Sequence, residues 1–280
     1  MSLSINTNAG AEHARVAAKK ASDMMNEAML RLSTGRRINT AKDDAAGIQV
    51  AIRIEAELNG LSQSLRNANN AQATVDTAEG ALNEVHTLLL RMREIAVSAA
   101  SETNSDADRL ALDTEVTSLE TEIKRIATST TWGGQVLLNG AFSKANPIVF
   151  QLGPKRTDNI SVTLGIIDTT AVSAQGGLSL SSNVQTITNA GNYISTIDRA
   201  ISIVSSRRGS LGAASNRLDS SIANINNMKA NLTSALGGVV DADFAAETAK
   251  LARAQILMQA ATAMLAQANA AKQQTLKLLG

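Results

Sequence analysis

The stretch AEGALNEVHTLLLRMREIAVSA, residues 78–99, carries apolar residues in alternating steps of four and three. Such a repeat places its members on one side of a helix, so the stretch predicts a long α-helix with a coiled-coil seam. The seam extends back to Leu58 if one shortened step is allowed after Val75, which would overwind the coil locally. Its members are Leu58, Leu61, Leu65, Ala68, Gln72, Val75, Ala78, Leu82, Val85, Leu89, Met92, Ala96 and Ala99.

Two more helices are expected beyond this one. The polar break SETNSDAD (101–108) precedes a second periodic segment, whose seam runs from Leu112 to Ile126. A break this short allows the second helix to fold back antiparallel on the first. The longest seam covers 187–236, and about 50 helical residues at 1.5 Å each would extend about 75 Å. The sequence therefore predicts a mostly α fold of long antiparallel coiled-coil helices.

Residues 132–182 have a different character. They contain the segments IVFQL (148–152) and NISVTL (159–164), in which apolar and polar residues alternate. The six residues between them, GPKRTD, are rich in turn formers, so we expect a β-hairpin. The polar, small-residue sequence that follows predicts an irregular connection.

The composition excludes several classes of function. The chain has 280 residues, no cysteine, 2% aromatic residues and a net charge of +1. Disulfides and thiolate metal sites are therefore excluded, and no global field favours nucleic acid or an anionic membrane. No apolar run approaches the roughly 20 residues that span a bilayer, and the first residues lack a signal-peptide pattern.

The two ends of the chain resemble each other. Residues 11–33 and 244–279 both predict alanine-rich amphipathic helices, which could pair if the chain doubles back. Gly237 and Gly238 are expected to break the preceding helix and to act as a hinge. We therefore divide the chain into a domain of residues 1–44 with 237–280 and a domain of residues 45–236. On the last helix, one seam contains Phe244, Leu251, Met258, Leu265, Ala268 and Leu279. A single chain would have little to pack against this seam, so we expect Phe244, Leu251, Met258 and Leu265 to lie at an interface between copies of the chain.

The segment RLSTGRRINTAKDDAAG (31–47) contains the strongest candidates for chemistry. Adjacent residues on a helix point about 100° apart, so Asp43 and Asp44 could not share one substrate. They fit a helix start better, with Asn39 or Thr40 as the N-cap. The segment also lacks the Lys-Ser/Thr pair of a phosphate-binding P-loop. Two histidines far apart and no cysteine do not indicate a zinc site. We predict no enzyme activity, no cofactor and no metal.

Several segments together resemble the bacterial flagellins, and the resemblance covers nearly the whole chain. They are INTN (5–8), RLSTGRRINTAKDDAAG (31–47), LRNANNAQATVDTAEGALNEV (65–85), RMREIAVSAASETNS (91–105), ISIVSSRRGSLGAASNRLDSSIANINN (201–227), DADFA (241–245) and RAQILMQAATAMLAQAN (253–269). The resemblance implies a short flagellin without large variable outer domains. Its terminal helices would pair to line the filament channel, and the long helices with the hairpin would form the outer wall.

The resemblance also implies a function, partners and site residues. The chain would be a structural subunit that polymerises with itself into the extracellular flagellar filament, after type III flagellar export assisted by a chaperone. It would meet the filament cap and the hook-junction proteins, and a host flagellin-sensing Toll-like receptor would contact Arg91, Ile95 and Glu115. Interface roles are implied for Arg31, Arg36, Arg37, Asn39, Lys42, Asp43 and Asp44. The alternatives are a hook–filament junction protein and a secreted coiled-coil effector or adaptor.

Overall fold

The computed structural model describes residues 7–142, 146–167, 177–180 and 183–279. These residues form long helices and two small antiparallel sheets. The chain divides into two compact units, one of Met1–Leu58 with Asn231–Gly280 and one of Asn59–Ala230. The two boundaries between the units, at 58/59 and 230/231, fall inside long helices. The first unit therefore includes one end of each of these helices. The functional division expected near residues 44 and 237 stays a prediction.

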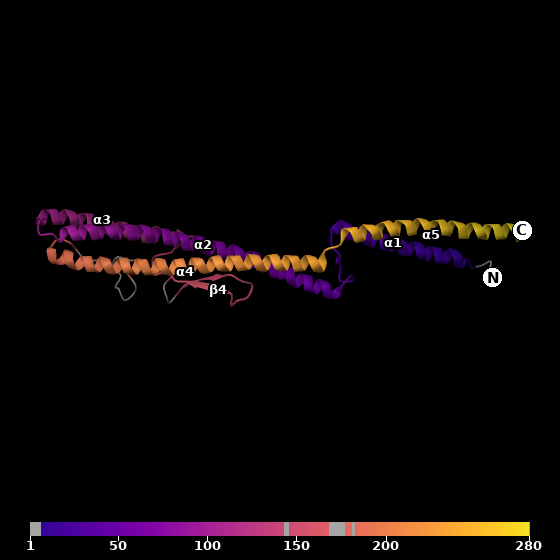
Figure 1. The fold of residues 1–280 in the computed structure, drawn as a ribbon, viewed down its shortest axis with the longest axis horizontal. Coiled ribbons are helices and arrows are strands. Elements are labelled where there is room, and N and C mark those ends of the chain that lie inside the picture. Colours follow the sequence, from indigo (N-terminus) through magenta and orange to yellow (C-terminus); the bar gives the residue numbers. More distant parts are fainter. Residues whose placement is uncertain (1–6, 143–145, 168–176, 181–182, 280) are drawn as a thin grey trace. The chain divides into compact units, whose positions relative to one another are not determined.

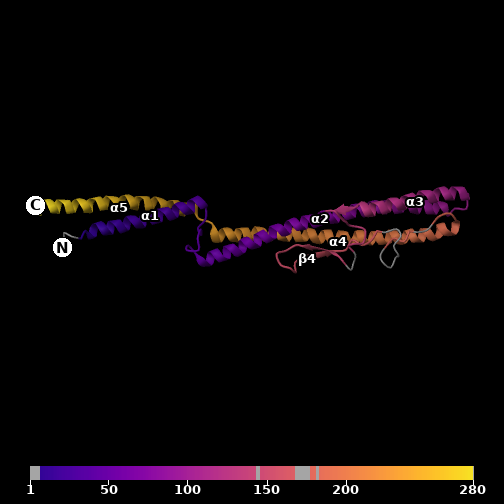
Figure 2. The same ribbon diagram turned by 180° about the vertical axis from the view of Figure 1, so that it is seen from behind.

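In the first unit, α1 (Ala9–Thr34) lies along α5 (Phe244–Leu279), as Figures 1 and 2 both show. The pair is antiparallel, because Arg31 near the end of α1 meets Glu247 near the start of α5, while Asn8 donates to the carbonyl of Ala268. Its buried positions are mostly alanines: Ala14, Ala21, Ala28, Ala254 and Ala261. Among the described helices, only these two repeatedly bring Cα atoms within 8 Å of each other. Small seam residues permit this close approach, and the predicted pairing of the termini is confirmed.

In the second unit, α2 (Ala45–Ala99), α3 (Asp106–Ser129) and α4 (Ile187–Val240) contribute to one apolar core. Three polar contacts fix the relative direction of α2 and α4. The pairs are Gln72–Ser215 at 2.7 Å, Glu79–Arg208 at 2.8 Å and Arg93–Asp198 at 2.7 Å. The partners on α4 come earlier in the chain as those on α2 come later, so the two helices are antiparallel. The predicted long antiparallel helices are confirmed.

The seam of α2 differs from the expected one in its first half. The buried positions there are Leu61, Ser64, Ala68, Ala71 and Val75. These positions alternate steps of three and four and continue in phase into Ala78 and Leu82. The expected shortened step after Val75 is therefore wrong. It came from assigning the larger side chains of Leu65 and Gln72 to the seam. Each of them lies one position after a buried residue and is itself less buried.

The junction between α2 and α3 and the contact between α3 and α4 each depend on a carboxylate. Ser105 and Asp108 form a capping box that starts α3 at the predicted polar break. Further along α3, Glu120 accepts a 2.6 Å hydrogen bond from the hydroxyl of Tyr193 on α4. Tyr193 is fully buried, and burial raises the pKa of both its hydroxyl and the carboxyl of Glu120. The only tyrosine of the chain thus joins two helices through a satisfied buried hydroxyl.

The middle region forms two hairpins. The predicted one is confirmed: β3 (Ile148–Gln151) pairs antiparallel with β4 (Asn159–Val162), with Phe150 opposite Ile160. A second, shorter hairpin of β1 (Thr131–Trp132) and β2 (Gln135–Val136) was not expected. Its turn is Gly133-Gly134, and both glycines have positive φ. Most of the expected irregular connection up to residue 182 lies outside the described residues.

The expected helix break at Gly237-Gly238 is wrong, because α4 continues through both residues to Val240. The break between the two helices lies instead at Asp241–Asp243. The carboxylate of Asp243 accepts hydrogen bonds from the backbone N–H groups of Ala245 and Ala246. This cap starts α5. The two glycines have low helix propensity, yet α4 continues through them. The helix ends only after Val240, just before the aspartate that caps α5.

Replacing Gly238 with alanine is therefore expected to stabilise the protein by about 1 kcal/mol, since the site is helical and a Cβ there meets nothing within 4 Å. The matched change Gly237→Ala should gain less, because its Cβ would lie 2.8 Å from Oδ2 of Asp241. Urea unfolding followed by far-ultraviolet circular dichroism measures both. Destabilisation by Gly238→Ala would contradict the helical assignment.

Candidate functional site

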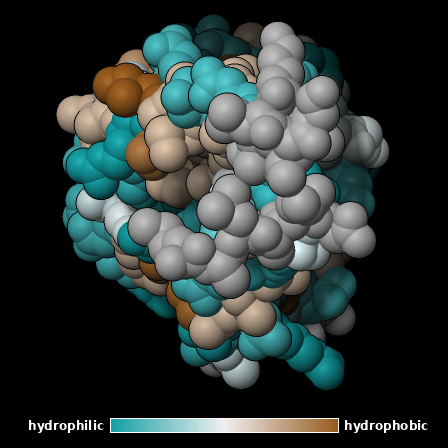
Figure 3. All heavy atoms as spheres, turned by 90° about the vertical axis from the view of Figure 1, so that its right-hand side faces the viewer, coloured by the Kyte–Doolittle hydropathy of each residue, from teal (hydrophilic) through white to brown (hydrophobic). Residues whose placement is uncertain are grey.

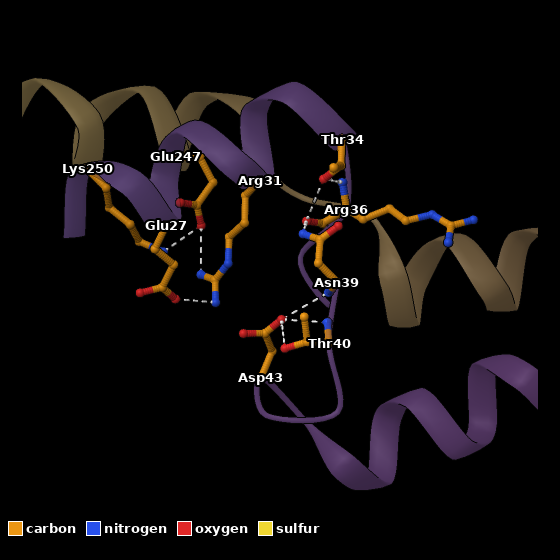
Figure 4. Close-up of polar contacts among 9 residues, drawn as sticks. All are labelled: Glu27, Arg31, Thr34, Arg36, Asn39, Thr40, Asp43, Glu247 and Lys250. Carbon is orange, nitrogen blue, oxygen red and sulfur yellow. Dashed lines mark hydrogen bonds and ion pairs between the residues drawn. The ribbon is translucent and has the colours of Figure 1, made fainter. Parts of the chain in front are cut away.

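The face that joins α1 to α5 contains one group of charges among its alanines (Figure 4). Glu247 is only 5% exposed, and its Oε1 lies 3.3 Å from Nη1 of Arg31 and 2.7 Å from Nζ of Lys250. Arg31 also contacts Glu27 at 2.6 Å, one turn earlier on α1. Two acids and two bases thus balance across the helix pair. A buried charge needs such partners.

The partners of Glu247 also set its protonation. Burial by itself raises the pKa of this carboxyl, but the hydrogen bonds and charges of Lys250 and Arg31 outweigh it. The net pKa of Glu247 lies below its ordinary value, so the carboxyl is ionised at neutral pH. The sequence reasoning named Arg31 but missed Glu27, Glu247 and Lys250. Spacing could have found Glu247, which stands four residues before Leu251 on the apolar stripe.

The segment after α1 is held by the chain that joins α4 to α5. α1 ends at Gly35 in the left-handed conformation, with φ 69°. The backbone N–H of Arg37 donates to the carbonyl of Val240 at 2.6 Å, and its guanidinium donates to the carbonyl of Val239 at 2.7 Å. The N–H of Ala242 returns a bond to the carbonyl of Gly35 at 3.0 Å. Residues 35–37 and 239–242 therefore form one joint through backbone hydrogen bonds.

The two adjacent aspartates are engaged in turns. Oδ2 of Asp43 accepts from the backbone N–H groups of Thr40 and Asn39 and from the Thr40 hydroxyl, and these bonds lower the pKa of Asp43. Oδ1 of Asp44 accepts from the N–H groups of Ala46 and Gly47 and so caps α2. The expected helix start is present, with Asp44 as the cap in place of Asn39 or Thr40. Both carboxylates serve local structure.

The other candidates of this segment lie at the surface. Asn39 is half-buried and donates through Nδ2 to the carbonyl of Arg36, while Lys42 is exposed. The guanidinium of Arg36 reaches Glu55 on α2 at 3.4 Å. The structure thus brings Arg31, Arg36, Arg37, Asn39 and Asp43 into one unit around the joint. Arg31 also lines a small cavity with Glu27, Glu247 and Lys250, in which the acids and bases are paired with one another.

The predicted seam of α5 is only partly as expected. Leu251, Met258 and Leu265 are half-buried and share a face with Ala254 and Ala261, so they line the contact with α1 in the same chain. The expectation that this seam has little to pack against within one chain is therefore wrong. Phe244, placed on the same seam, is 64% exposed. Leu279 lies where no side-chain burial is described.

The three receptor candidates lie on α2 and α3. Nε and Nη2 of Arg91 lie 3.2 and 2.9 Å from Oε1 of Glu115, and Arg91 also contacts Glu94. Arg91 is exposed and Glu115 is half-buried, and both side chains reach solvent at the surface of the helix pair. Ile95, the third residue implied to contact the receptor, is only 3% exposed and belongs to the core. In the structure, the charged side chains of Arg91 and Glu115 pair with each other, and the side chain of Ile95 is buried in the core.

No described residues form a cluster of three or more histidine, cysteine, aspartate or glutamate side chains with metal-binding geometry. Over the same residues, no helix combines the length and hydropathy that crossing a bilayer requires.

Comparison with known proteins gives the family. Residues 5–143 match the bacterial flagellin N-terminal helical region, and residues 194–279 match the bacterial flagellin C-terminal helical region. The chain is 39% identical to a flagellin of Halalkalibacterium halodurans, over 90% of this chain and 91% of the relative. The chain belongs to the bacterial flagellin family. It is also 31% identical over the full length of both chains to polar flagellin F of Vibrio parahaemolyticus.

Solved structures agree with the fold of this flagellin. The crystal structure of Bacillus cereus flagellin is similar with a TM-score of 0.50 and 30% identity, covering 57% of this chain and 88% of that one. A putative flagellar hook-associated protein from Vibrio parahaemolyticus is similar with a TM-score of 0.61 over 71% of this chain and all of the other. Its 17% identity shows the fold alone and does not favour the junction-protein alternative.

The flagellin is therefore a structural subunit of the extracellular flagellar filament, which bacteria use for swimming. The site that matters for this function is a surface for assembly.

Proposed function

We propose that α1 and α5 together are the polymerisation element of this flagellin, with separate faces for two tasks. One face is the alanine seam, which pairs the helices within a subunit. The other faces contact neighbouring subunits. The observation that carries this proposal is the set of large apolar side chains exposed on the two helices: Val16, Met29, Leu30, Phe244, Ile256, Leu257 and Met264.

An exposed set of this kind is typical of an interaction surface. Figure 3 views the molecule from the right-hand side of Figure 1, and hydrophobic spheres reach this surface among hydrophilic ones. Burial of such side chains contributes about 25 cal/mol per Å² of apolar surface, offset by the cost of ordering the subunits. A contact between different faces of identical subunits does not close on itself, so it propagates as an open helical filament.

Charges placed on this surface should stop assembly. The double variant Ile256→Glu and Met264→Glu is expected to lose filament formation, because each glutamate would have to be desolvated at the subunit contact. Both sites are exposed in the single chain, so the monomer should keep its helical circular dichroism. Sedimentation and electron microscopy measure filament yield. The matched control, Gln259→Glu and Gln267→Glu, adds the same charge at exposed polar sites of α5. Wild-type filament yield from the apolar-site variant would contradict the proposal.

We further propose that this flagellin leaves the cell through the flagellar type III export apparatus with a chaperone, and that it meets cap and hook-junction proteins at the filament ends. Family membership supports these partners. Blocking the export apparatus should retain the flagellin inside the cell, as fractionation and immunoblotting would show. Secretion at the normal level would contradict this route.

We also propose that a flagellin-sensing Toll-like receptor binds the monomer weakly, through the exposed pair of Arg91 and Glu115. Arg91→Ala should reduce the response in a receptor-reporter assay, while burial of Ile95 removes one expected contact. The exposed pair contributes at most about 1 kcal/mol to stability, so the fold should persist. Arg125→Ala, which breaks the exposed pair with Glu122 on α3, is the matched control. No response to saturating wild-type monomer would contradict receptor binding.

A further inference from the structure

We infer that Asn139 is a site of spontaneous covalent modification, at which the main chain of this flagellin converts an asparagine into aspartate and isoaspartate. The reacting groups are the side-chain amide of Asn139 and the backbone nitrogen of Gly140. The only co-reactant is water. This inference is independent of how the subunits assemble.

The local structure presents the side-chain amide to the chain that follows. Asn139 is exposed to water, and its Oδ1 accepts a 3.0 Å hydrogen bond from the backbone N–H of Ala141. That bond folds the side chain back over the Asn139–Gly140 peptide, in an Asx turn. The amide carbon, Cγ, is thus held on the side of the chain where the Gly140 nitrogen lies. Solvent reaches the same group.

The fold itself requires glycine as the next residue. Gly140 has φ +92°, a conformation that other residues rarely adopt. A Cβ at this position would also lie 2.4 Å from Cγ1 of Ile166, which forms a β-bridge with Asn139. Any larger residue would therefore be strained both by its backbone conformation and by its contact with Ile166. Glycine has no side chain, so only the backbone of this β-bridge restrains the nitrogen of residue 140, and the packing against Ile166 preserves the Asn-Gly dipeptide.

The reaction is balanced with water alone. The Gly140 nitrogen loses its proton to water or a base in solution and forms a bond to Cγ of Asn139. Nδ2 takes up a proton from the solution as its bond to Cγ breaks, and it leaves as ammonia. Water then opens the resulting cyclic imide at either carbonyl. One opening gives aspartate, and the other gives isoaspartate, in which the main chain runs through the former side chain. No oxidation or reduction takes place.

The chain contains a matched internal control. Its other Asn-Gly dipeptide is Asn59-Gly60, which lies inside α2 (Ala45–Ala99). There the helical backbone hydrogen-bonds the glycine N–H along the helix axis and fixes the dihedral angles of both residues. The nitrogen of Gly60 is thus held away from the side chain before it. The same dipeptide is expected to react at Asn139 and to be protected at Asn59.

Conversion should alter the core near the short hairpin. Isoaspartate lengthens the main chain at a place where Gly140 already lies against Ile166. The adjoining residues are held tightly: the N–H of Ile167 donates to the carbonyl of Leu138 at 2.9 Å, and both side chains are fully buried. A longer chain cannot keep this hydrogen bond and the glycine contact together. Modified subunits should therefore unfold at lower temperature than unmodified ones.

The test is timed incubation of the purified full-length flagellin in mildly alkaline buffer. Peptide mapping by mass spectrometry follows the amide-to-acid conversion at both dipeptides, and enzymatic methylation of isoaspartate identifies the isomer. Asn139 should convert at least about ten-fold faster than Asn59, a ratio that corresponds to about 1.4 kcal/mol in the barrier. Its rate should also lie within about ten-fold of that in a synthetic peptide spanning 135–142, where no fold restrains the dipeptide. The variant Asn139→Gln should abolish the product at this site.

Two results would overturn the inference. Conversion at Asn59 as fast as at Asn139 would show that local structure does not select the site. A folded-state rate at Asn139 more than about ten-fold below the peptide rate would show that the turn protects the asparagine.

Discussion

Replacing Arg31 with methionine is expected to destabilise the α1–α5 pair by about 3 kcal/mol, the lower end of the range for breaking a buried ion pair. The change leaves Glu247, which is 5% exposed, without its partner on the other helix. Lys250 would remain as a neighbour, but its side chain is half exposed to water. We take the lower end because the side chain of Arg31 keeps some contact with solvent.

The location of the effect can be measured directly. Trp132 is the only tryptophan and belongs to the unit Asn59–Ala230. Urea unfolding followed by tryptophan fluorescence thus reports that unit, while circular dichroism reports the helices of both units. Arg31→Met should shift the circular dichroism transition and leave the Trp132 transition in place. An equal shift of both signals would contradict a local role in the α1–α5 pair.

A second substitution separates the ion pair from the loss of a side chain. The double variant Arg31→Met with Glu247→Leu should recover most of the lost stability, since apolar replacement of both members of a buried pair is often neutral or stabilising. Arg15→Ala is the matched control, because Arg15 pairs with Glu12 at a well-exposed site of the same helix. It should cost at most about 1 kcal/mol. A double variant less stable than either single one would contradict this account.

The same pair predicts a pH dependence with a definite sign. The folded-state pKa of Glu247 is lowered, so its stabilising contribution is complete above the unfolded pKa, about 4.3, and disappears as pH falls through the folded value. The difference in stability between the wild type and Glu247→Gln should therefore shrink as the solution is acidified below about pH 4.

The helices could be predicted from the sequence because their seams repeat over many turns. The predicted β3–β4 hairpin also had two alternating segments and a turn sequence between them. The seam of α2 was misplaced near Ser64 and Ala71 because the larger side chains one position further on, Leu65 and Gln72, were taken as its members. Small residues occupy the buried positions along this part of α2, and side-chain size alone does not show which face is covered.

The errors at the candidate site have physical causes as well. Gly237 and Gly238 have low helix propensity, but the tertiary contacts of their helix override it. The resemblance implied a receptor contact for Ile95, yet its side chain is 3% exposed and belongs to the core. Glu247 was missed because its partner lies 216 positions earlier in the chain. Long-range pairs of this kind follow only from the antiparallel register of α1 and α5.

Deleting residues 245–280 is expected to abolish polymerisation and to leave the unit Asn59–Ala230 folded. The deletion removes nearly all of α5, and with it the partner of the alanine face of α1. α1 would then lack the tertiary packing from which most of the stability of a helix in a protein comes. Both helices that carry the proposed polymerisation surface would be lost together.

The core of the second unit does not depend on α5. Its buried residues come from α2, α3, α4, strand β4 and the connecting segments between α3 and α4, and they form one continuous cluster within residues 68–218. The Trp132 unfolding transition of the truncated protein should therefore match that of the full chain. Helical circular dichroism should fall by the share of α1 and α5 only, and loss of all helical signal would show that the two units fold as one.

Seeding measures the polymerisation part of the prediction. Truncated protein is added to fragments of wild-type filaments, and elongation is followed by light scattering and electron microscopy. Full-length flagellin serves as the positive control. The Gln259→Glu and Gln267→Glu variant shows how much a change in charge alone slows growth. The truncated protein should not extend the seeds, because it lacks the helix pair that the next subunit would bury. Elongation at the full-length rate would place the essential subunit contacts outside α1 and α5 and would refute the proposed polymerisation element.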